Sequence, residues 1–276
     1  MKLTMLGTGN ALVTECYNTC FVLSDAGQHF LVDGGGGSAI LHQLKHAGID
    51  WMDVRTIFVT HKHVDHLLGV VWMVRMICQF MRQGSYTGEA TIYANDEVAG
   101  LLVEFAQKLL QPQEAAQIGP RLHIVAVADG EQRRVLGRPV TFFDIGSTKA
   151  KQFGFSMNLE PQEAPQLQRR DEGRLVCCGD EPCTPAGRPY AAGARWLLHE
   201  AFCLHSQADV FHPYEKHHST VKDACELAEQ LGVENLVIYH TEDHTLSQRR
   251  QLYTAEGRAY YRGNLFVPDD LDSIEL

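Results

Sequence analysis

The feature that most restricts the fold of this chain is a cluster of three histidines and one aspartate directly after an apolar segment. Residues 56–60 read Thr-Ile-Phe-Val-Thr and predict a buried strand. The cluster follows at once, at His61, His63, Asp65 and His66. Burying such side chains costs roughly a few kcal/mol each unless each finds a partner. The fold is therefore expected to bring the cluster to a strand end where its members share a ligand.

The spacing within the cluster is typical of a metal site. On an extended strand end His61 and His63 face the same way, so two imidazoles can bind one metal ion. Asp65 and His66 come after the chain bends and can reach a second metal close by. Imidazole and carboxylate donors together suit zinc, manganese or iron. A solvated histidine-rich turn is the alternative interpretation, and it leaves the spacing to chance.

The remaining pattern predicts two sheets covered by helices. Residues 1–6, 20–23 and 30–33 read as short strands, and a four-glycine tract then leads into a helix with Ile40, Leu41 and Leu44 on one face. Further strands are expected at about 122–127, 140–144, 153–159, 174–178, 195–199 and 235–239, and helices at about 66–82, 97–110, 219–231 and 246–256. Residues 160–173 are polar and predict a surface loop. We expect an α/β chain, a four-layer αβ/βα sandwich, forming one domain over residues 1–276.

Composition narrows the function classes. With 45% apolar and 21% charged residues the chain is ordinary for a globular protein. Its net charge of −10 repels phosphate backbones and argues against a large structured RNA as substrate. The apolar run at 67–80, interrupted by Arg75, is shorter than the roughly 18 residues that span a bilayer, so we expect a buried helix and no membrane. The N-terminus lacks a signal-peptide pattern, and we expect the protein in the cytoplasm.

Eight cysteines without any CxxC pair are interpreted as reduced and mainly buried. Cys177 and Cys178 are neighbours in a predicted strand, so their side chains should point to opposite faces.

The segment from Thr56 to Gly69 resembles the metal-binding signature of the metallo-β-lactamase superfamily, and its surroundings resemble the ribonuclease Z branch. Further similar blocks follow in family order at residues 2–9, 31–37, 178–180, 197–201, 218–220 and 235–240. The resemblance covers nearly the whole chain. It implies the metallo-β-lactamase fold and a homodimer. The activity it implies is that of a metal-dependent phosphodiesterase that uses a metal-activated hydroxide. Zinc is the metal we expect first, with manganese or iron as the others.

The resemblance also implies roles for residues far from the cluster. Asp180 matches a carboxylate that bridges two metals, and His240 matches the last ligand; without the resemblance they would be an ordinary turn aspartate and a structural histidine. Asp65 would orient the attacking hydroxide as well as bind metal. Glu200 and His218 match a pair that passes a proton to the leaving oxygen, since a carboxylate fixes the tautomer of its imidazole. The alternative is that His218 only caps the helix expected from residue 219.

The sequence departs from the family pattern in two places. Residues 142–155 contain no histidine where the family has a third imidazole for the first metal, and Gly146 is the expected position of the missing ligand. Water or a neighbour such as Asp144 would fill the gap. Residues 155–179 carry Arg169, Arg170 and Arg174 but are too few for the basic arm with which tRNA-processing members grip tRNA.

Two other functions therefore stay open. One is a hydrolase of the same fold that acts on a small ester, namely a sulfate ester, a thioester or a cyclic phosphodiester. The other is a degenerate binding protein that uses the fold and one metal to sense a ligand.

Overall fold

Residues 1–159 and 173–276 are described by the computed structural model, and they form two mixed seven-stranded sheets. The predicted loop at 160–173, with Arg169 and Arg170, lies outside the described residues except at its end. In order across the first sheet the strands are β14 (Ser273–Glu275), β1 (Lys2–Gly7), β2 (Cys20–Asp25), β3 (Gln28–Val32), β4 (Val54–Val59), β5 (Ala90–Ala94) and β6 (Leu122–Ala126). The order in the second is β13 (Asn264–Phe266), β12 (Asn235–Tyr239), β11 (Trp196–Glu200), β10 (Arg174–Cys177), β9 (Phe153–Asn158), β8 (Arg138–Asp144) and β7 (Gln132–Val135).

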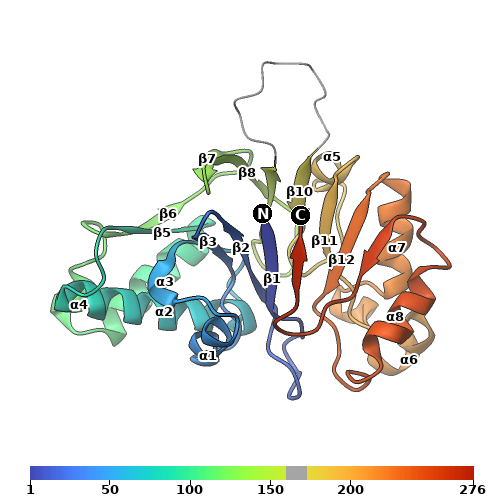
Figure 1. Cartoon of the computed structure of the whole chain (residues 1–276), viewed down its shortest axis with the longest axis horizontal. Helices are drawn as coiled ribbons and strands as arrows, with labels where there is room; N and C mark the ends of the chain where they lie inside the picture. The colour runs from blue at the N-terminus through green and yellow to red at the C-terminus, as the bar shows by residue number, and fades with distance from the viewer. Residues whose placement is uncertain (160–172) are drawn as a thin grey trace.

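Helices cover the outer face of each sheet. Those beside the first sheet are α1 (Ala39–His46), α2 (Val64–Gln83), α3 (Asp96–Leu109) and α4 (Pro112–Ala115). Those beside the second are α5 (Arg188–Ala191), α6 (Ala208–Phe211), α7 (Val221–Gln230) and α8 (Arg249–Gly257). Figure 1 shows the two groups of helices on opposite sides of the sheets, with the two chain ends side by side between them. The four layers are those expected from the sequence.

Side-chain alternation along the strands produces three apolar layers. On β1, Leu3 and Met5 pack between the two sheets, while Leu6 packs against the helices of the first sheet. On the second sheet, Cys177 lies between the sheets and Cys178 faces the helices. A strand places successive side chains on opposite faces, so each central strand contributes to two layers. The expectation for the two cysteines is met.

The glycine tract after β3 brings the chain close to α2. A Cβ on Gly69 would lie 1.7 Å from the carbonyl oxygen of Gly34, and a Cβ on Gly34 would lie 2.4 Å from the amide nitrogen of Val70. Two backbone hydrogen bonds tie the segments together, from Gly34 N–H to His66 O and from Gly69 N–H to Gly35 O, each at 2.9 Å. Only glycine allows this approach. The contact fixes the first turn of α2, which carries Asp65 and His66.

Helix α2 is long and apolar enough, by length and composition, to cross a membrane, and among the described residues it is alone in this. Of its most apolar stretch, 56% is buried within the fold. Buried residues such as Met73 and Ile77 pack against the first sheet. These contacts are those of a core helix.

Candidate metal centre

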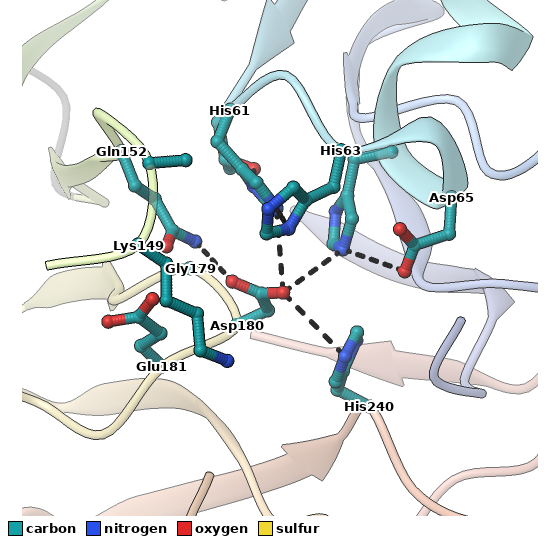
Figure 2. A network of polar contacts seen from close by, with 12 residues as sticks. His61, His63, Asp65, Lys149, Gln152, Gly179, Asp180, Glu181 and His240 are labelled. Carbon is teal, nitrogen blue, oxygen red and sulfur yellow. Dashed lines mark hydrogen bonds and ion pairs between the residues drawn. The ribbon is translucent and has the colours of Figure 1, made fainter. Parts of the chain in front are cut away.

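Six side chains meet where strands of both sheets end. His61 and His63 follow β4, Asp65 and His66 lie in the first turn of α2, Asp180 follows β10, and His240 follows β12. Asp180 is central: its Oδ2 lies 3.5 Å from Nε2 of His61, 3.5 Å from Nε2 of His66 and 3.6 Å from Nε2 of His240. Figure 2 shows this carboxylate between the imidazoles. The six predicted ligands therefore lie together around Asp180.

The donor atoms fall into two groups. The first contains His61, His63 and Asp180, and the second contains Asp65, His66 and His240; within each group the donor atoms lie within 4.8 Å of one another. In the first group, His61 Nε2 and His63 Nδ1 face each other at 2.8 Å. Asp180 reaches into both groups, which is the placement required of a bridging carboxylate.

In three of the histidines, a hydrogen bond at Nδ1 fixes the orientation of the imidazole ring. Nδ1 of His61 pairs with Thr60 Oγ1 at 2.9 Å, and Nδ1 of His240 pairs with Thr19 Oγ1 at 3.1 Å. Nδ1 of His66 pairs with Asp33 Oδ2 at 2.7 Å. Each ring therefore turns its Nε2 towards Asp180, as outer contacts of metal-binding histidines do.

Asp33 is a member of the site to which the sequence assigned no role. Its carboxylate also accepts hydrogen bonds from Thr60 N–H and Thr60 Oγ1–H, both at 2.8 Å. Strands β3 and β4 are parallel neighbours, so Asp33 and Thr60 lie at the same edge of the sheet. A carboxylate at the end of the adjacent strand was the signal that could have identified it.

The burial and charge of these residues fit a divalent metal. His66 Nε2 makes no hydrogen bond within the described residues, although carboxylate oxygens of Asp65 and Asp180 lie 3.4 and 3.5 Å away. Burial opposes a proton on His66, but the charges of Asp33 and Asp65 outweigh it and raise the pKa of His66 well above its ordinary value. A field that attracts a proton so strongly to a buried nitrogen also attracts a metal cation.

The rings of His61 and His240 are in the ligand form. Burial holds the pKa of His61 well below its ordinary value and lowers the pKa of His240 to about 3, so both imidazoles are neutral. Burial would raise the pKa of Asp180, but hydrogen bonding and charge from the surrounding imidazoles outweigh it and hold the pKa well below its ordinary value. Neutral imidazole and charged carboxylate are the forms that bind metal.

The backbone at His240 is strained. This residue has φ +60°, in the left-handed region that non-glycine residues rarely adopt. Such a conformation costs about 1–3 kcal/mol and persists where the surrounding structure enforces it. Here backbone bonds hold it, because Ala201 N–H binds Tyr239 O at 3.0 Å and Thr241 N–H binds Thr8 O at 3.0 Å.

Glu200 and His218 lie beside the centre. Oε2 of Glu200 is 3.6 Å from Nδ1 of His218, and the His218 ring centroid is 5.1 Å from that of His240. Oε1 of Glu200 accepts the N–H of Ser219 at 2.7 Å. Burial works to lower the pKa of His218, but the pairing with Glu200 prevails and raises it. The cap of α7 is Thr220, whose side chain accepts the N–H of Asp223, so the alternative in which His218 caps this helix is wrong.

Comparison with known protein families and proteins shows which proteins this chain is related to. Residues 1–257 match the family described as Anti-Pycsar protein Apyc1. The chain belongs to the Apyc1 family. Ribonuclease Z from Methanothermobacter thermautotrophicus is 27% identical over 314 residues, covering 100% of this chain and 97% of that protein.

Solved structures agree on the fold. The metallo-β-lactamase fold protein YhfI from Bacillus subtilis has a TM-score of 0.73 at 16% identity, over 99% of both chains. A diphosphatase from the PhnP family has a TM-score of 0.71 at 17% identity, over 100% of this chain and 97% of its own. The predicted metallo-β-lactamase fold and the ribonuclease Z-like relationship are confirmed. The chain is a metal-dependent hydrolase of the phosphodiesterase class.

Within this Apyc1 family member, the segment that lacks the third histidine is the connection between β8 and β9. Gly146 has φ +72°, and a Cβ there would meet Thr184 Oγ1 at 3.5 Å and Ala186 at 3.6 Å, which is ordinary contact. Asp144 accepts the N–H of Gly146 at 2.8 Å and so closes a turn; it belongs to neither donor group found among the described residues. The side chain of this connection that reaches the centre is Gln152, which the sequence did not single out.

A cavity of about 280 Å³ lies next to the acid pair. Its lining residues include His218, Glu181, Gly146, Tyr214 and His217. Ser147 Oγ–H donates to Glu181 Oε1 at 2.8 Å, which joins the β8–β9 connection to the segment after Asp180. The N–H of Lys149, in the same connection, donates to Ser147 Oγ at 3.2 Å. Polar side chains therefore line a cavity beside the acid pair.

Proposed function

We propose that this chain hydrolyses a small phosphodiester with the help of one or two divalent metal ions, zinc in the first place and manganese or iron otherwise. The proposed ligands are His61, His63, Asp65, His66, Asp180 and His240. The observation that carries the proposal is the position of Asp180 Oδ2, which lies within 3.6 Å of three imidazole nitrogens drawn from both donor groups. When bound, such ions lower the pKa of water towards neutrality and stabilise negative charge on phosphoryl oxygens.

Side chains of the chain itself would orient the attacking water and protonate the leaving oxygen. The carboxylate of Asp65, buried beside His66, would orient the attacking water as well as bind metal. His218 would donate its proton to the leaving oxygen as general acid. Glu200 would keep His218 protonated, in keeping with its raised pKa.

Size and charge favour a small substrate over a folded RNA. The cavity beside His218 has about 280 Å³, close to the lower end of the roughly 300–1,000 Å³ of typical small-molecule pockets. The net charge of −10 opposes the approach of a large polyanion, since binding one depends on basic groups that release its counterions. Pre-tRNA should therefore be a poor substrate, even though a relative is a ribonuclease Z.

The test is hydrolysis of bis(p-nitrophenyl) phosphate with added zinc or manganese, against a pre-tRNA, a nitrophenyl sulfate and a thioester. We expect turnover of the phosphodiester, none by Asp180→Ala, and wild-type turnover by His123→Ala, which removes an exposed histidine paired with Glu89. Efficient, site-specific cleavage of pre-tRNA would overturn the choice of a small substrate. Turnover of the sulfate or thioester alone would move the protein to another ester class, and metal binding without any turnover would favour a ligand-sensing protein.

The proposal includes a cytoplasmic homodimer formed by residues 1–276 as one domain. An apolar stripe supports the dimer: Val64, Leu68 and Trp72 on one face of α2 and Leu109 at the end of α3 are 64%, 36%, 39% and 68% exposed. Residues spaced by four on one helix form a continuous face that can pack on its own copy across a two-fold axis. Light scattering should give twice the chain mass, and Trp72→Glu should give a monomer. A monomeric wild type would contradict the dimer.

A further inference from the structure

Gln152, in the β8–β9 connection, is buried against the central carboxylate of the metal centre. Only 1% of the residue is exposed. Its Nε2–H donates to Oδ1 of Asp180 at 2.7 Å, as Figure 2 shows. The two oxygens of Asp180 therefore have different partners: Oδ1 faces one amide, and Oδ2 faces the three imidazoles. An amide oxygen in the place of Nε2 would set two acceptors against each other at this distance, so the orientation of the amide is fixed by charge.

The surrounding backbone is shaped to admit this amide. Gly179 precedes Asp180 with φ +76°, and a Cβ on it would lie 2.3 Å from Gln152 Nε2. A side chain at position 179 would therefore displace the amide, quite apart from the conformational preference for glycine. The glycine provides the space through which Gln152 reaches the carboxylate.

Backbone bonds hold Gln152 in place from both sides. Ile145 N–H binds Gln152 O at 3.1 Å, which closes the connection between the strands. Phe153 N–H binds Thr60 O at 3.0 Å, next to His61. Gln152 is thus joined to the segment that carries the first metal ligands as well as to Asp180.

We propose that Gln152 is a positioning residue of the metal centre, which holds Asp180 so that Oδ2 faces both donor groups. The inference rests on the ligand set proposed above. A carboxylate held in its binding orientation loses less rotational freedom when metal binds, and contacts of this kind contribute about 10–100-fold to metal affinity. The effect should be greatest in the group of His61, His63 and Asp180, which has one ligand fewer than the resemblance leads one to expect.

The experiment replaces Gln152 by methionine, which keeps the length and nearly the volume of the side chain and removes the donor. Zinc affinity is measured by competition with a chromophoric chelator, and the visible spectrum of the cobalt(II)-loaded protein reports ligand geometry. The matched control is Lys151→Met, because Lys151 Nζ pairs with the exposed Asp96 at 2.7 Å, and Asp96 belongs to neither donor group. We expect Gln152→Met to weaken the looser metal about 10–100-fold and to change the cobalt spectrum, while Lys151→Met matches wild type.

Gln152→Glu provides a second test that does not depend on the methionine variant folding well. It sets a second carboxylate against Oδ1 of Asp180, so the metal-free protein should melt at a lower temperature than wild type. Zinc should restore much of this loss, because a cation bound at Oδ2 offsets the negative charge of Asp180 that the new carboxylate meets. A residue that only fills space would give a loss of stability that zinc leaves unchanged.

The outcomes separate this inference from the proposed function. Wild-type protein that binds no metal overturns both. Wild-type protein with two metals, together with unchanged zinc affinity and cobalt spectrum in Gln152→Met, overturns the role of Gln152 and leaves the ligand set standing.

Discussion

Replacing Glu200 by glutamine tests the proposed proton donor most sharply, because it changes charge with almost no change of shape. The retained amide oxygen can still accept the N–H of Ser219, which lies 2.7 Å from Glu200 Oε1. The new amide nitrogen would face Nδ1 of His218, now 3.6 Å from the other carboxylate oxygen. An amide N–H there favours the neutral tautomer in which Nδ1 accepts. The variant should therefore lose the protonated form of His218.

The size of the effect on His218 can be worked out from its distance to Glu200. A unit charge pair at 3.6 Å is worth about 4–5 kcal/mol at an effective dielectric constant of about 20. Desolvation of the two buried groups opposes this attraction, so the net effect is smaller. We expect turnover of substrates with poor leaving groups to fall about 10²–10⁴-fold, which is the range that a general acid supplies.

The assay compares kcat/KM for a series of phosphodiesters whose leaving groups run from nitrophenol to simple alcohols. Nitrophenolate leaves without a proton, so its release should slow by less than about tenfold, whereas alkyl esters should show the full loss. Metal content should equal that of wild type, because Glu200 belongs to neither donor group. Ser219→Ala, which removes a hydroxyl contact to Glu200 but keeps the charge, serves as the control.

An equal loss for every leaving group would refute this reasoning, since it would mean that Glu200 supports the fold or the metal and not the leaving oxygen. Loss of metal from the variant would refute it as well.

Three further predictions concern the same centre. Asp180→Ala should remove metal and activity together, because the two donor groups lose the oxygen they share; full metal content by elemental analysis would contradict the bridging role. Gly146→His should tighten the looser metal about 10–100-fold in a zinc titration, and the strain at φ +72°, about 1–3 kcal/mol, should appear as a lower melting temperature; unchanged metal affinity in a folded variant would mean that the missing ligand belongs elsewhere. Because the pKa of His218 is raised, its acid form is present below that pKa and lost as pH rises through it, so turnover of alkyl esters should fall only above the ordinary histidine range; a fall centred below pH 6.5 would contradict this.

The ligands near the strand ends could be predicted because their spacing is local. His61 and His63 lie on the extended segment after β4, and Asp65 and His66 lie on the first turn of α2. Four donors are therefore positioned by one short stretch of chain. Asp180 and His240 were assigned by resemblance, and their meeting depends on the packing of two sheets. Strand periodicity predicts which residues are buried, but it does not predict which strand ends meet.

Several strands could not be predicted from the sequence pattern. Residues 132–135 read Gln-Arg-Arg-Val and are largely exposed, so no apolar alternation marks β7. β13 and β14 are three residues each and pair only at sheet edges. Residues 90–94, which form β5, alternate buried and half-buried positions, yet a five-residue segment between polar stretches was passed over. Short edge strands are specified by their neighbours more than by their own residues.

The gap left by the missing histidine drew attention to Gly146, whereas Gln152, near the other end of the same connection, was not predicted. Gly146 was chosen as the position in residues 142–155 that stands where the family has its third imidazole. In the fold the connection closes on itself, because Ile145 N–H binds Gln152 O at 3.1 Å, and its first and last residues lie side by side. A donor near the end of the connection can therefore reach the centre as readily as one near its start. Gln152 does so through a hydrogen bond to Asp180, an acceptor that lies 28 positions further along the chain. Such a contact depends on how the connection closes and on the glycine at position 179, and neither can be predicted from the family pattern.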